Sequence, residues 1–403
     1  MINRSLKVLV VDDTTTYRMI VRKAAEAIAG VEVVDFAANG RIAMDKLSRM
    51  AVDVVLLDVE MPEMDGLTTL RHITEQYPKI SVVMVSGASH ANANIVVECL
   101  NAGAFDFVTK PLESDIDHSR GELISSLKPI LSVLAKQGRG AAAAPARRGV
   151  GPPAQESGHT RESATSAVWQ PVSVVGQAPA PPAGGAASPN RSGTVVAARS
   201  QPTTTPTATS WNQKPGMVLI GASTGGPAAL TQVLNGIGPA LPIPMLIVQH
   251  MPPMFTTSLA AQLSRTTGHA VQEAAQDQEV RPGKVLLAPG GRHLSVKRYG
   301  TALRAVLNDG PKVNGCRPAV DVLFLSVMAS FADPILAVIL TGMGTDGANG
   351  VKGLKRMEKT YCLTQSRESC VVYGMPRAVV EMGLSDAAIP LTQIGNKISE
   401  LCR

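Results

Sequence analysis

Short apolar runs alternate with amphipathic segments along the first 135 residues of the chain. Five runs rich in Val, Leu and Ile have the length of buried β-strands, and they lie at residues 6–11, 31–36, 53–57, 81–85 and 105–108. The intervening segments carry apolar positions at helical spacing. Because strands that alternate with helices form parallel sheets, the pattern predicts a five-stranded, doubly wound α/β domain over residues 1–135.

The same alternation returns after residue 214 and continues to the end of the chain. Apolar runs at residues 217–220, 245–248, 284–288, 304–307 and 335–340 again have strand length. They predict a second doubly wound α/β domain over residues 215–403, with a mostly parallel sheet.

The segment between the two domains, residues 136–214, has a different composition. It contains ten prolines and is rich in Ala, Gly, Ser and Thr, with almost no apolar periodicity. Such a segment cannot bury enough apolar surface to become ordered, so we expect a flexible linker. Its eight Lys or Arg residues and two Asp or Glu residues account for the whole formal net charge of +6. The two domains are therefore balanced in charge, and no nucleic-acid partner is expected.

The cysteines and the N-terminus bear on the compartment. Five cysteines are scattered without a CxxC pair, which favours a reducing environment. The chain begins with MINRSLKVLVVDD, which enters the first strand without the apolar region of a signal peptide. No apolar run approaches the length that spans a membrane. We therefore expect a cytoplasmic protein with no membrane insertion.

Polar residues end the apolar strands of the first domain. Asp12 and Asp13 follow one strand, Asp58 and Ser86 follow two others, and Lys110 follows the last. The carboxyl ends of parallel strands share one edge of the sheet, where ligands bind. Three carboxylates suit Mg²⁺, and with Lys110 the cation would offset charge on a phosphoryl group that Asp58 attacks. The hydroxyl of Ser86 would then hydrogen-bond the phosphoryl oxygens.

A single acidic residue at a strand end has an ordinary explanation as a helix cap or a solvated loop residue. Convergence of several such positions on one edge favours a site. The stretches VVDD (10–13), LLDVEMPEMDG (56–66), VMVSGAS (83–89) and VTKP (108–111) resemble the receiver domains of two-component signalling. The resemblance implies a five-stranded fold, Mg²⁺ near Asp13 and Asp58, phosphorylation of Asp58 by a histidine kinase, and Phe107 as the aromatic residue of the switch.

The second domain opens with a strand and a loop of small residues, VLIGASTGGPAAL (218–230). The loop lacks the lysine of a GxxxxGK[ST] phosphate loop, and its glycines do not have GxGxxG spacing. Gly221, Ser223 and Gly225 instead satisfy GxSxG, a turn that exposes a serine at the end of a strand. Glycine and serine also fill many such turns for steric reasons alone, so a nucleophile needs a base.

Two further strand ends supply that base and its carboxylate. His250 follows the strand at 245–248, and Asp346 lies in TGMGTDG after the strand at 335–340. Ser223, His250 and Asp346 would then be nucleophile, general base and orienting acid. The chain order Ser, His, Asp differs from that of α/β-hydrolases.

Three more residues are candidates around this triad. The amide of Met343 could stabilise an oxyanion, and Thr224 could position His250 or the substrate. His293, in APGGRHL, also follows a strand and is the rival base. We rank it instead as a substrate-site or structural residue.

Six stretches of the second domain resemble the chemotaxis protein-glutamate methylesterase family, CheB. They are GASTGGP (221–227), QHMP (249–252), LAPGGRH (287–293), DGPKVNGCRPAVD (309–321), LTGMGTDG (340–347) and SCVVYGMP (369–376). The resemblance implies a response regulator that hydrolyses glutamate γ-methyl esters on methyl-accepting chemotaxis receptors and deamidates receptor glutamines, with no cofactor at the esterase site. It carries over Ser223, His250 and Asp346 as the triad.

The resemblance also implies that the unphosphorylated receiver blocks the esterase cleft until Asp58 is phosphorylated. The connecting segment is longer here than is usual, so we expect a milder block. Two other functions remain as alternatives. One is an inactive signalling adaptor that uses the esterase fold as a binding module, and the other is a regulator that binds DNA.

Overall fold

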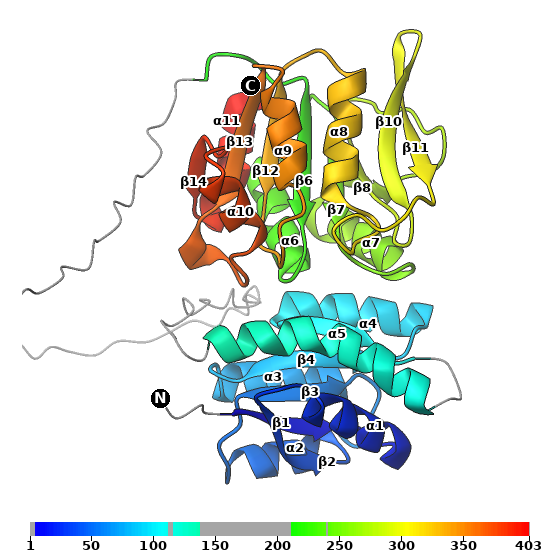
Figure 1. Ribbon diagram of the computed structural model, residues 1–403, viewed down its shortest axis with the longest axis vertical. Helices are drawn as coiled ribbons and strands as arrows, with labels where there is room; N and C mark the ends of the chain where they lie inside the picture. The colour runs from blue at the N-terminus through cyan, green and yellow to red at the C-terminus, as the bar shows by residue number, and fades with distance from the viewer. Residues whose placement is uncertain (1–4, 112–115, 138–210, 239–240, 403) are drawn as a thin grey trace, which may run out of the picture. The chain divides into compact units, whose positions relative to one another are not determined.

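The computed structural model describes residues 5–111, 116–137, 211–238 and 241–402. Most of the predicted linker, residues 138–210, lies outside the described residues, so that prediction and the domain limits stand as predictions. The described residues form two α/β domains, whose elements are labelled in Figure 1.

The first domain is the expected five-stranded parallel sheet. Its strands run in the order β2-β1-β3-β4-β5, so the chain starts at β1, adds β2 on one side and then β3, β4 and β5 on the other. The strands are β1 (Leu6–Val11), β2 (Val31–Ala37), β3 (Val54–Asp58), β4 (Ser81–Ser86) and β5 (Asp106–Thr109). The helices are α1 (Thr15–Glu26), α2 (Gly40–Leu47), α3 (Gly66–Gln76), α4 (His90–Ala102) and α5 (Ile116–Gln137).

Both faces of this sheet are covered, which explains why its strands are almost continuously apolar. Val8 and Val10 of β1 pack toward α1 and α5, and Leu9 and Val11 pack toward the opposite helices. Polar caps begin three of the helices. Asn39, Asp65 and Ser89 each accept a hydrogen bond from a backbone amide three residues later, at the start of α2, α3 and α4.

The second domain has a seven-stranded sheet in the order β14-β13-β12-β6-β7-β9-β8, and its pairings are parallel. Its strands are β6 (Met217–Ala222), β7 (Met245–Gln249), β8 (Ala270–Glu273), β9 (Lys284–Leu287), β12 (Ile335–Ile339), β13 (Thr360–Gln365) and β14 (Ala387–Ile389). Its helices are α6 (Gly226–Ile237), α7 (Phe255–Thr267), α8 (Val320–Ser330), α9 (Ala348–Lys355), α10 (Met375–Glu381) and α11 (Leu391–Cys402), with a 3₁₀ turn η1 (Arg367–Ser369). The predicted fold class is confirmed in both domains.

One predicted strand has a different partner from the one expected. Residues 304–307 lie in β11 (Ala302–Asn308), which pairs antiparallel with β10 (His293–Tyr299) in a separate two-stranded sheet. Apolar Leu303 and Ala305 alternate with polar or half-exposed neighbours, a pattern that suits a strand buried on one face only. The hairpin packs its buried side chains against α8.

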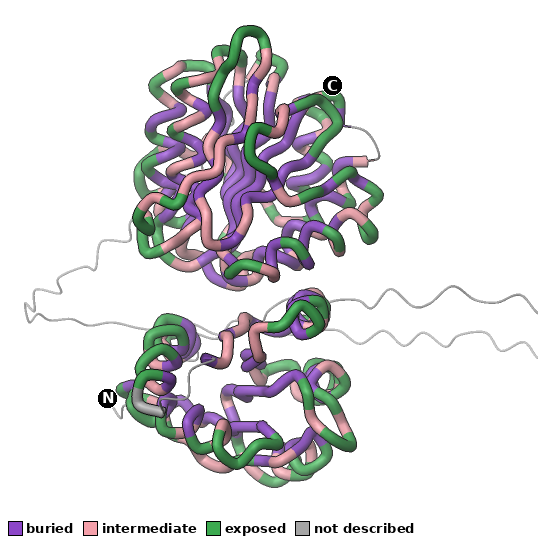
Figure 2. The backbone as a smooth tube through the Cα atoms, turned by 90° about the vertical axis from the view of Figure 1, so that its right-hand side faces the viewer, coloured by how far each residue is buried: buried purple, intermediate pink, exposed green. Residues whose placement is uncertain are grey.

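The three central strands of the second sheet, β12, β6 and β7, are neighbours. They are fully buried in the interior of the domain, as the tube in Figure 2 shows. Because they are parallel, the loops after their last residues, Ile339, Ala222 and Gln249, emerge at one edge. This topology brings Ser223, His250 and the loop of Asp346 together.

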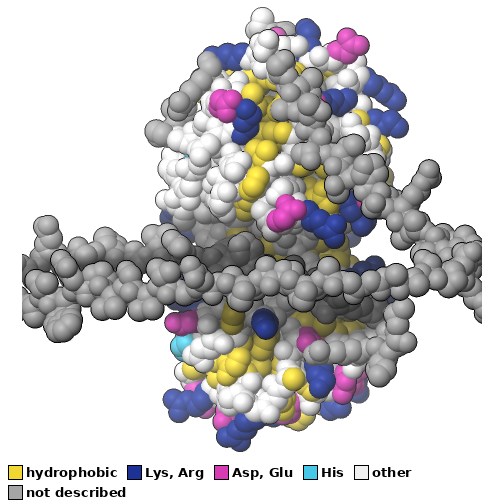
Figure 3. Space-filling model, turned by 90° about the vertical axis from the view of Figure 1, so that its left-hand side faces the viewer, with side chains coloured by type: hydrophobic (Ala, Val, Ile, Leu, Met, Phe, Trp, Pro, Cys, Tyr) yellow, Lys and Arg dark blue, Asp and Glu magenta, His cyan; other side chains and the backbone are white. Residues whose placement is uncertain are grey.

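The surface of the molecule carries charges of both signs. On the face drawn in Figure 3, Lys and Arg side chains are interspersed with Asp and Glu side chains. Within the residues that the structure describes, no helix is both long and apolar enough to cross a bilayer.

Candidate functional site

The first domain gathers its predicted carboxylates at the carboxyl edge of its sheet. One ligand oxygen from each of Asp12, Asp13 and Asp58 lies within 4.8 Å of the others. Lys110 Nζ lies 2.6 Å from Asp58 Oδ2 and 2.7 Å from Asp12 Oδ2. A cluster of three acidic groups with one ammonium has a surplus of negative charge, and its all-oxygen donor set fits a hard divalent cation.

Asp58 ends β3 in a buried position. Burial raises the pKa of its carboxyl to about 6, against the opposing effect of the Lys110 ammonium and with a further contribution from Asp12. The carboxylate also accepts a hydrogen bond from the amide of Val59 at 2.7 Å. At neutral pH Asp58 is therefore ionised, which is the state a phosphoryl acceptor needs.

Ser86 and Phe107 occupy the neighbouring strands. Ser86 ends β4 and is fully buried, with its hydroxyl donating to the carbonyl of Gly87 at 3.2 Å. Phe107 lies on β5 and is half-buried. Ser86 thus ends the strand next to β3, and Phe107 lies on the edge strand beyond it.

The Ser223 loop joins β6 to α6 and is held by its backbone. The amide of Ser223 donates to the carbonyl of Thr341 at 3.0 Å, and the amide of Gly226 donates back to the Ser223 carbonyl at 2.7 Å. Gln249 Nε2 also donates to the Ser223 carbonyl, at 3.0 Å. Gly226 leaves room for that amide, since a Cβ built on Gly226 would lie 1.9 Å from Gln249 Oε1. The small residues of this loop are therefore required by close packing. The Ser223 side chain itself is half-buried.

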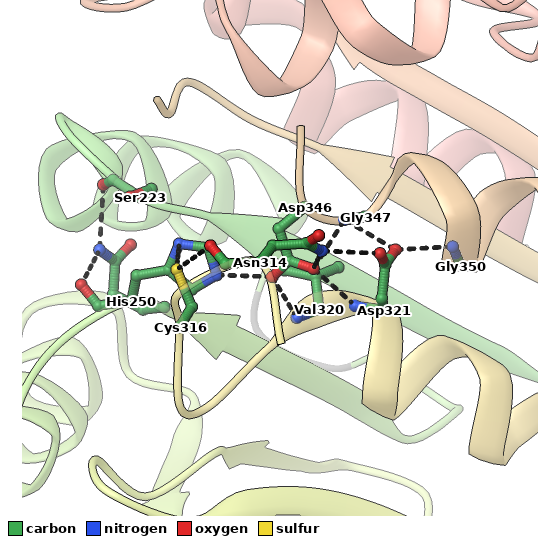
Figure 4. Close-up of polar contacts among 10 residues, drawn as sticks. Ser223, His250, Asn314, Cys316, Val320, Asp321, Asp346, Gly347 and Gly350 are labelled. Atoms are coloured by element: carbon green, nitrogen blue, oxygen red, sulfur yellow. Dashed lines mark hydrogen bonds and ion pairs between the residues drawn. The ribbon is translucent and has the colours of Figure 1, made fainter. Parts of the chain in front are cut away.

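His250 and Asp346 form a buried pair. His250 Nε2 lies 2.8 Å from Asp346 Oδ2, as Figure 4 shows, although the two residues are 96 positions apart in the sequence. Burial alone would lower the pKa of His250, but hydrogen bonds to Asp346 and Cys316 raise it to about 9. Burial would raise the pKa of Asp346, and its contacts with His250 hold it below the ordinary value instead.

The Asp346 carboxylate is fixed by a network that the sequence motifs did not reveal. Backbone amides of Val320 and Asp321, at the start of α8, donate to it at 2.6 and 3.1 Å. The side-chain amide of Asn314 donates to Asp346 Oδ1 and to Asp321 Oδ2, at 2.9 Å each. These contacts appear as dashed lines in Figure 4. Asn314 and Asp321 lie within the family-like stretch 309–321, which was the available signal.

The third pairing of the predicted triad is not formed. The backbones meet, since the amide of His250 donates to the carbonyl of Ala222 at 3.2 Å, next to Ser223. Among the described residues, however, no hydrogen bond joins the Ser223 hydroxyl to the imidazole. The second ring nitrogen of His250, Nδ1, instead lies 3.5 Å from the thiol of Cys316.

Two candidate residues lie in the loops beside Ser223. Met343 is half-buried in the loop after β12, and its backbone amide has no hydrogen-bond acceptor among the described residues. Thr224 is buried and its carbonyl accepts from the Thr341 hydroxyl at 3.0 Å. The hydroxyl of Thr224 donates to Asp106 Oδ2 at 2.5 Å and not to His250.

His293 begins β10 and is only 1% exposed. Its Nε2 lies 2.9 Å from the carbonyl of Pro311, and no described carboxylate pairs with it. A side chain so enclosed has little access to a substrate. Of the roles considered for His293, which were general base, substrate-site residue and structural residue, this burial favours the structural one.

The second site as a whole offers an alcohol, an imidazole bound to a buried carboxylate, and a free backbone amide at one edge of a parallel sheet. An arrangement of this kind suits acyl transfer to a serine, with the amide as an oxyanion donor.

Comparisons with known proteins agree with both halves of the chain. Residues 218–398 match the CheB methylesterase family, and residues 8–118 match the response regulator receiver domain family. A protein-glutamate methylesterase/protein-glutamine glutaminase of Desulfotalea psychrophila is 35% identical over 98% of this chain and 98% of its own length. One of the same name from Alkalilimnicola ehrlichii is 37% identical over 98% and 99%. The crystal structure of the CheB methylesterase catalytic domain of Thermotoga maritima is 39% identical, and it covers 47% of this chain and 99% of that one with a TM-score of 0.45.

Proposed function

The chain belongs to the protein-glutamate methylesterase/protein-glutamine glutaminase family, and we propose that it hydrolyses glutamate γ-methyl esters on chemoreceptors and deamidates receptor glutamines. The observation that carries the proposal is the His250–Asp346 pair at the strand edge beside Ser223. Acyl transfer to a serine requires a general base near the hydroxyl and a carboxylate that orients the base, and these groups are present here.

In the proposed reaction, the hydroxyl oxygen of Ser223 attacks the γ-carbonyl carbon and His250 takes the hydroxyl proton. Collapse of the tetrahedral intermediate breaks the bond to methoxide or amide, and His250 returns the proton so that methanol or ammonia leaves. Water then cleaves the glutamyl ester on Ser223 by the same route. Asp346 keeps the imidazole oriented and stabilises its charged form.

The negative oxygen of the intermediate needs donors that are not already occupied. The amide of Met343 meets that condition within the described part of the chain. We propose it as one oxyanion donor, together with amides of the loop that leads into α6.

We propose that Asp58 receives a phosphoryl group from the histidine kinase of the chemotaxis system. Asp12, Asp13 and Asp58 would hold Mg²⁺, which when bound offsets negative charge on the phosphoryl oxygens. Lys110 also contacts Asp58 and Asp12. Ser86 and Phe107 would respond to the phosphoryl group as the switch pair.

Contacts between residues of the receiver and of the esterase support the proposed block. The described residues of both domains belong to one compact unit. Asp106 accepts a hydrogen bond from Thr224, which is adjacent to the proposed nucleophile, and the ring of Phe107 lies 4.6 Å from that of Phe255. A change at Phe107 on phosphorylation would therefore act on its contact with Phe255 and on the adjacent Asp106, which accepts from the neighbour of Ser223.

Release of methanol from methylated receptor membranes, with and without a small phosphodonor, tests this proposal. We expect slow release that increases when the phosphodonor and Mg²⁺ are added. A folded protein that releases no methanol under either condition would refute the enzymatic function and favour the adaptor alternative. If methanol were released at the same rate with and without the phosphodonor, only the proposed control of the esterase by the receiver would be refuted.

A further inference from the structure

One tight turn contacts both members of the His250–Asp346 pair. Val313 and Cys316 exchange two backbone hydrogen bonds, of 3.0 and 2.9 Å, around Asn314 and Gly315. Both central residues have positive φ, 52° and 78°, which Asn and Gly tolerate best. The turn thus fixes the direction of the two side chains that flank Gly315.

Each of these side chains reaches a different residue of the pair. The Asn314 amide donates to Asp346 and to Asp321, and so bridges two buried carboxylates. The Cys316 sulfur lies 3.5 Å from His250 Nδ1 (Figure 4). Asp346 occupies the other nitrogen, Nε2, so Nδ1 is the position left for the Ser223 hydroxyl.

We propose that the turn Val313–Cys316 is a positioning element of the esterase site, in which Asn314 holds Asp346 and the Cys316 thiol competes with Ser223 for His250. The inference rests on the proposed acyl-transfer function. It assigns Cys316 the role of a positioning residue that restrains the base, while Ser223 remains the nucleophile.

The groups around the imidazole agree with this role. Asp346 and Cys316 contact the ring, and Asp321 lies behind Asp346 across the Asn314 amide. Contacts with both Asp346 and Cys316 favour the protonated imidazole and oppose the effect of burial. Removal of the thiol frees Nδ1 and makes the neutral imidazole, which is the active base, easier to form.

The first test compares full-length wild type with Cys316→Ala over pH 6 to 10, with methanol release as the assay. We expect the rising limb of kcat/KM to move to lower pH, with about threefold more activity at pH 7, as half a pKa unit would give. Cys370→Ala is the matched control, because Cys370 is also half-buried but its sulfur contacts the carbonyl of Gln365. If the rising limb of kcat/KM in Cys316→Ala lay at the same pH as in wild type, whatever the rate, the proposed competition between Cys316 and Ser223 for His250 would be wrong.

The second test does not depend on turnover. The His250 imidazole can be titrated by NMR in the full-length protein and assigned with His250→Ala. We expect its pKa to fall in Cys316→Ala and to remain at the wild-type value in Cys370→Ala. If this shift appeared but the protein released no methanol, the Cys316–His250 contact would be supported and only the esterase function refuted. If the His250 pKa did not shift in Cys316→Ala, the inference itself would be overturned.

Asn314 has its own variants. Asn314→Asp keeps a residue that tolerates positive φ but places a third carboxylate beside Asp321 and Asp346. We expect it to move the His250 titration to higher pH, because negative charge favours the imidazolium. Asn314→Gly keeps the turn without the amide, and we expect about tenfold lower kcat with little change in KM. Wild-type kcat in Asn314→Gly would overturn the role of Asn314.

Discussion

The two sites use buried groups whose pKa values are both raised, yet the consequences are opposite. Burial raises the pKa of Asp58 to about 6, which still leaves the carboxylate ionised and nucleophilic at neutral pH. His250 reaches about 9 because its partners overcome burial, and this leaves the imidazole protonated at neutral pH, when it cannot act as a base. The receiver is therefore ready to react, and the esterase as described is restrained.

The difference follows from what surrounds each group. Burial raises the pKa of Asp58, Asp12 adds to this effect, and the Lys110 ammonium offsets only part of it. His250 has only partners that favour its charged form, Asp346 and Cys316. Removal of the Cys316 thiol should therefore activate the site, whereas a change at Asp58 should only disconnect the site from its signal.

The largest expected effect is that of Ser223→Ala. Loss of the proposed nucleophile should lower methanol release by about a thousandfold or more, because acyl transfer to the enzyme is no longer available. Thermal unfolding should be unchanged, since the hydroxyl accepts and donates no hydrogen bond to a described residue.

Ser264→Ala is the control for this variant, because Ser264 is also half-buried but lies on α7, where its hydroxyl donates to the carbonyl of His269. Near-normal release by a folded Ser223→Ala protein would remove the basis for acyl transfer at this site.

The next effect is on the pH profile of wild type. The pKa of His250 near 9 means that the neutral imidazole grows about tenfold per pH unit below that value. Hydrolysis should therefore increase roughly fiftyfold between pH 7 and pH 9 and then level off. The assay is methanol release in buffers of constant ionic strength. A profile that is already flat at pH 7 would contradict a protonated resting base.

Asp58→Asn should leave basal hydrolysis intact and abolish its stimulation by a phosphodonor, because the amide cannot accept the phosphoryl group. Stimulation of about tenfold is expected in wild type, as is usual for coupled sites. Asp45→Asn, which changes an exposed carboxylate paired with Arg49, should retain the stimulation. Radiolabel incorporation measures the same difference, and label retained in Asp58→Asn would move the phosphorylation site elsewhere.

The smallest expected effect is that of Asp106→Ala, which removes the acceptor for Thr224. Basal hydrolysis should increase about threefold without phosphodonor, since one hydrogen bond of the proposed block is lost. Asp35→Ala, on β2, removes a carboxylate that contacts Lys46 and should have no such effect. Unchanged basal activity would mean that the Asp106–Thr224 contact does not restrain the esterase.

Much of the architecture could be predicted because the central strands, such as β3, β6, β7 and β12, are short, fully buried apolar runs. Ser223, His250, Asp346 and Asp58 could be proposed for the same reason, since they stand where such runs end. The hairpin partner of residues 304–307 could not be predicted, because an apolar run carries no information on which strand pairs with it.

The residues that surround the proposed triad were harder to predict. Asn314, Cys316 and Asp321 lie in a loop and at a helix start, where no periodic pattern marks which side chain turns inward. Their importance depends on hydrogen bonds between segments that are far apart along the chain. The missing Ser223–His250 contact likewise depends on side-chain rotamers, which the residue types alone do not determine.

The Gln249 side chain limits how the Ser223 loop could be transferred to another α/β protein. The glycine at position 226 is needed because a side-chain amide from the neighbouring strand lies over it. If residues 221–227 were transferred alone, a cavity would remain next to Gly226, and the carbonyl of Ser223 would lose the hydrogen bond from the Gln249 side chain. The minimal transferable unit is therefore the loop together with the last residue of the adjacent strand.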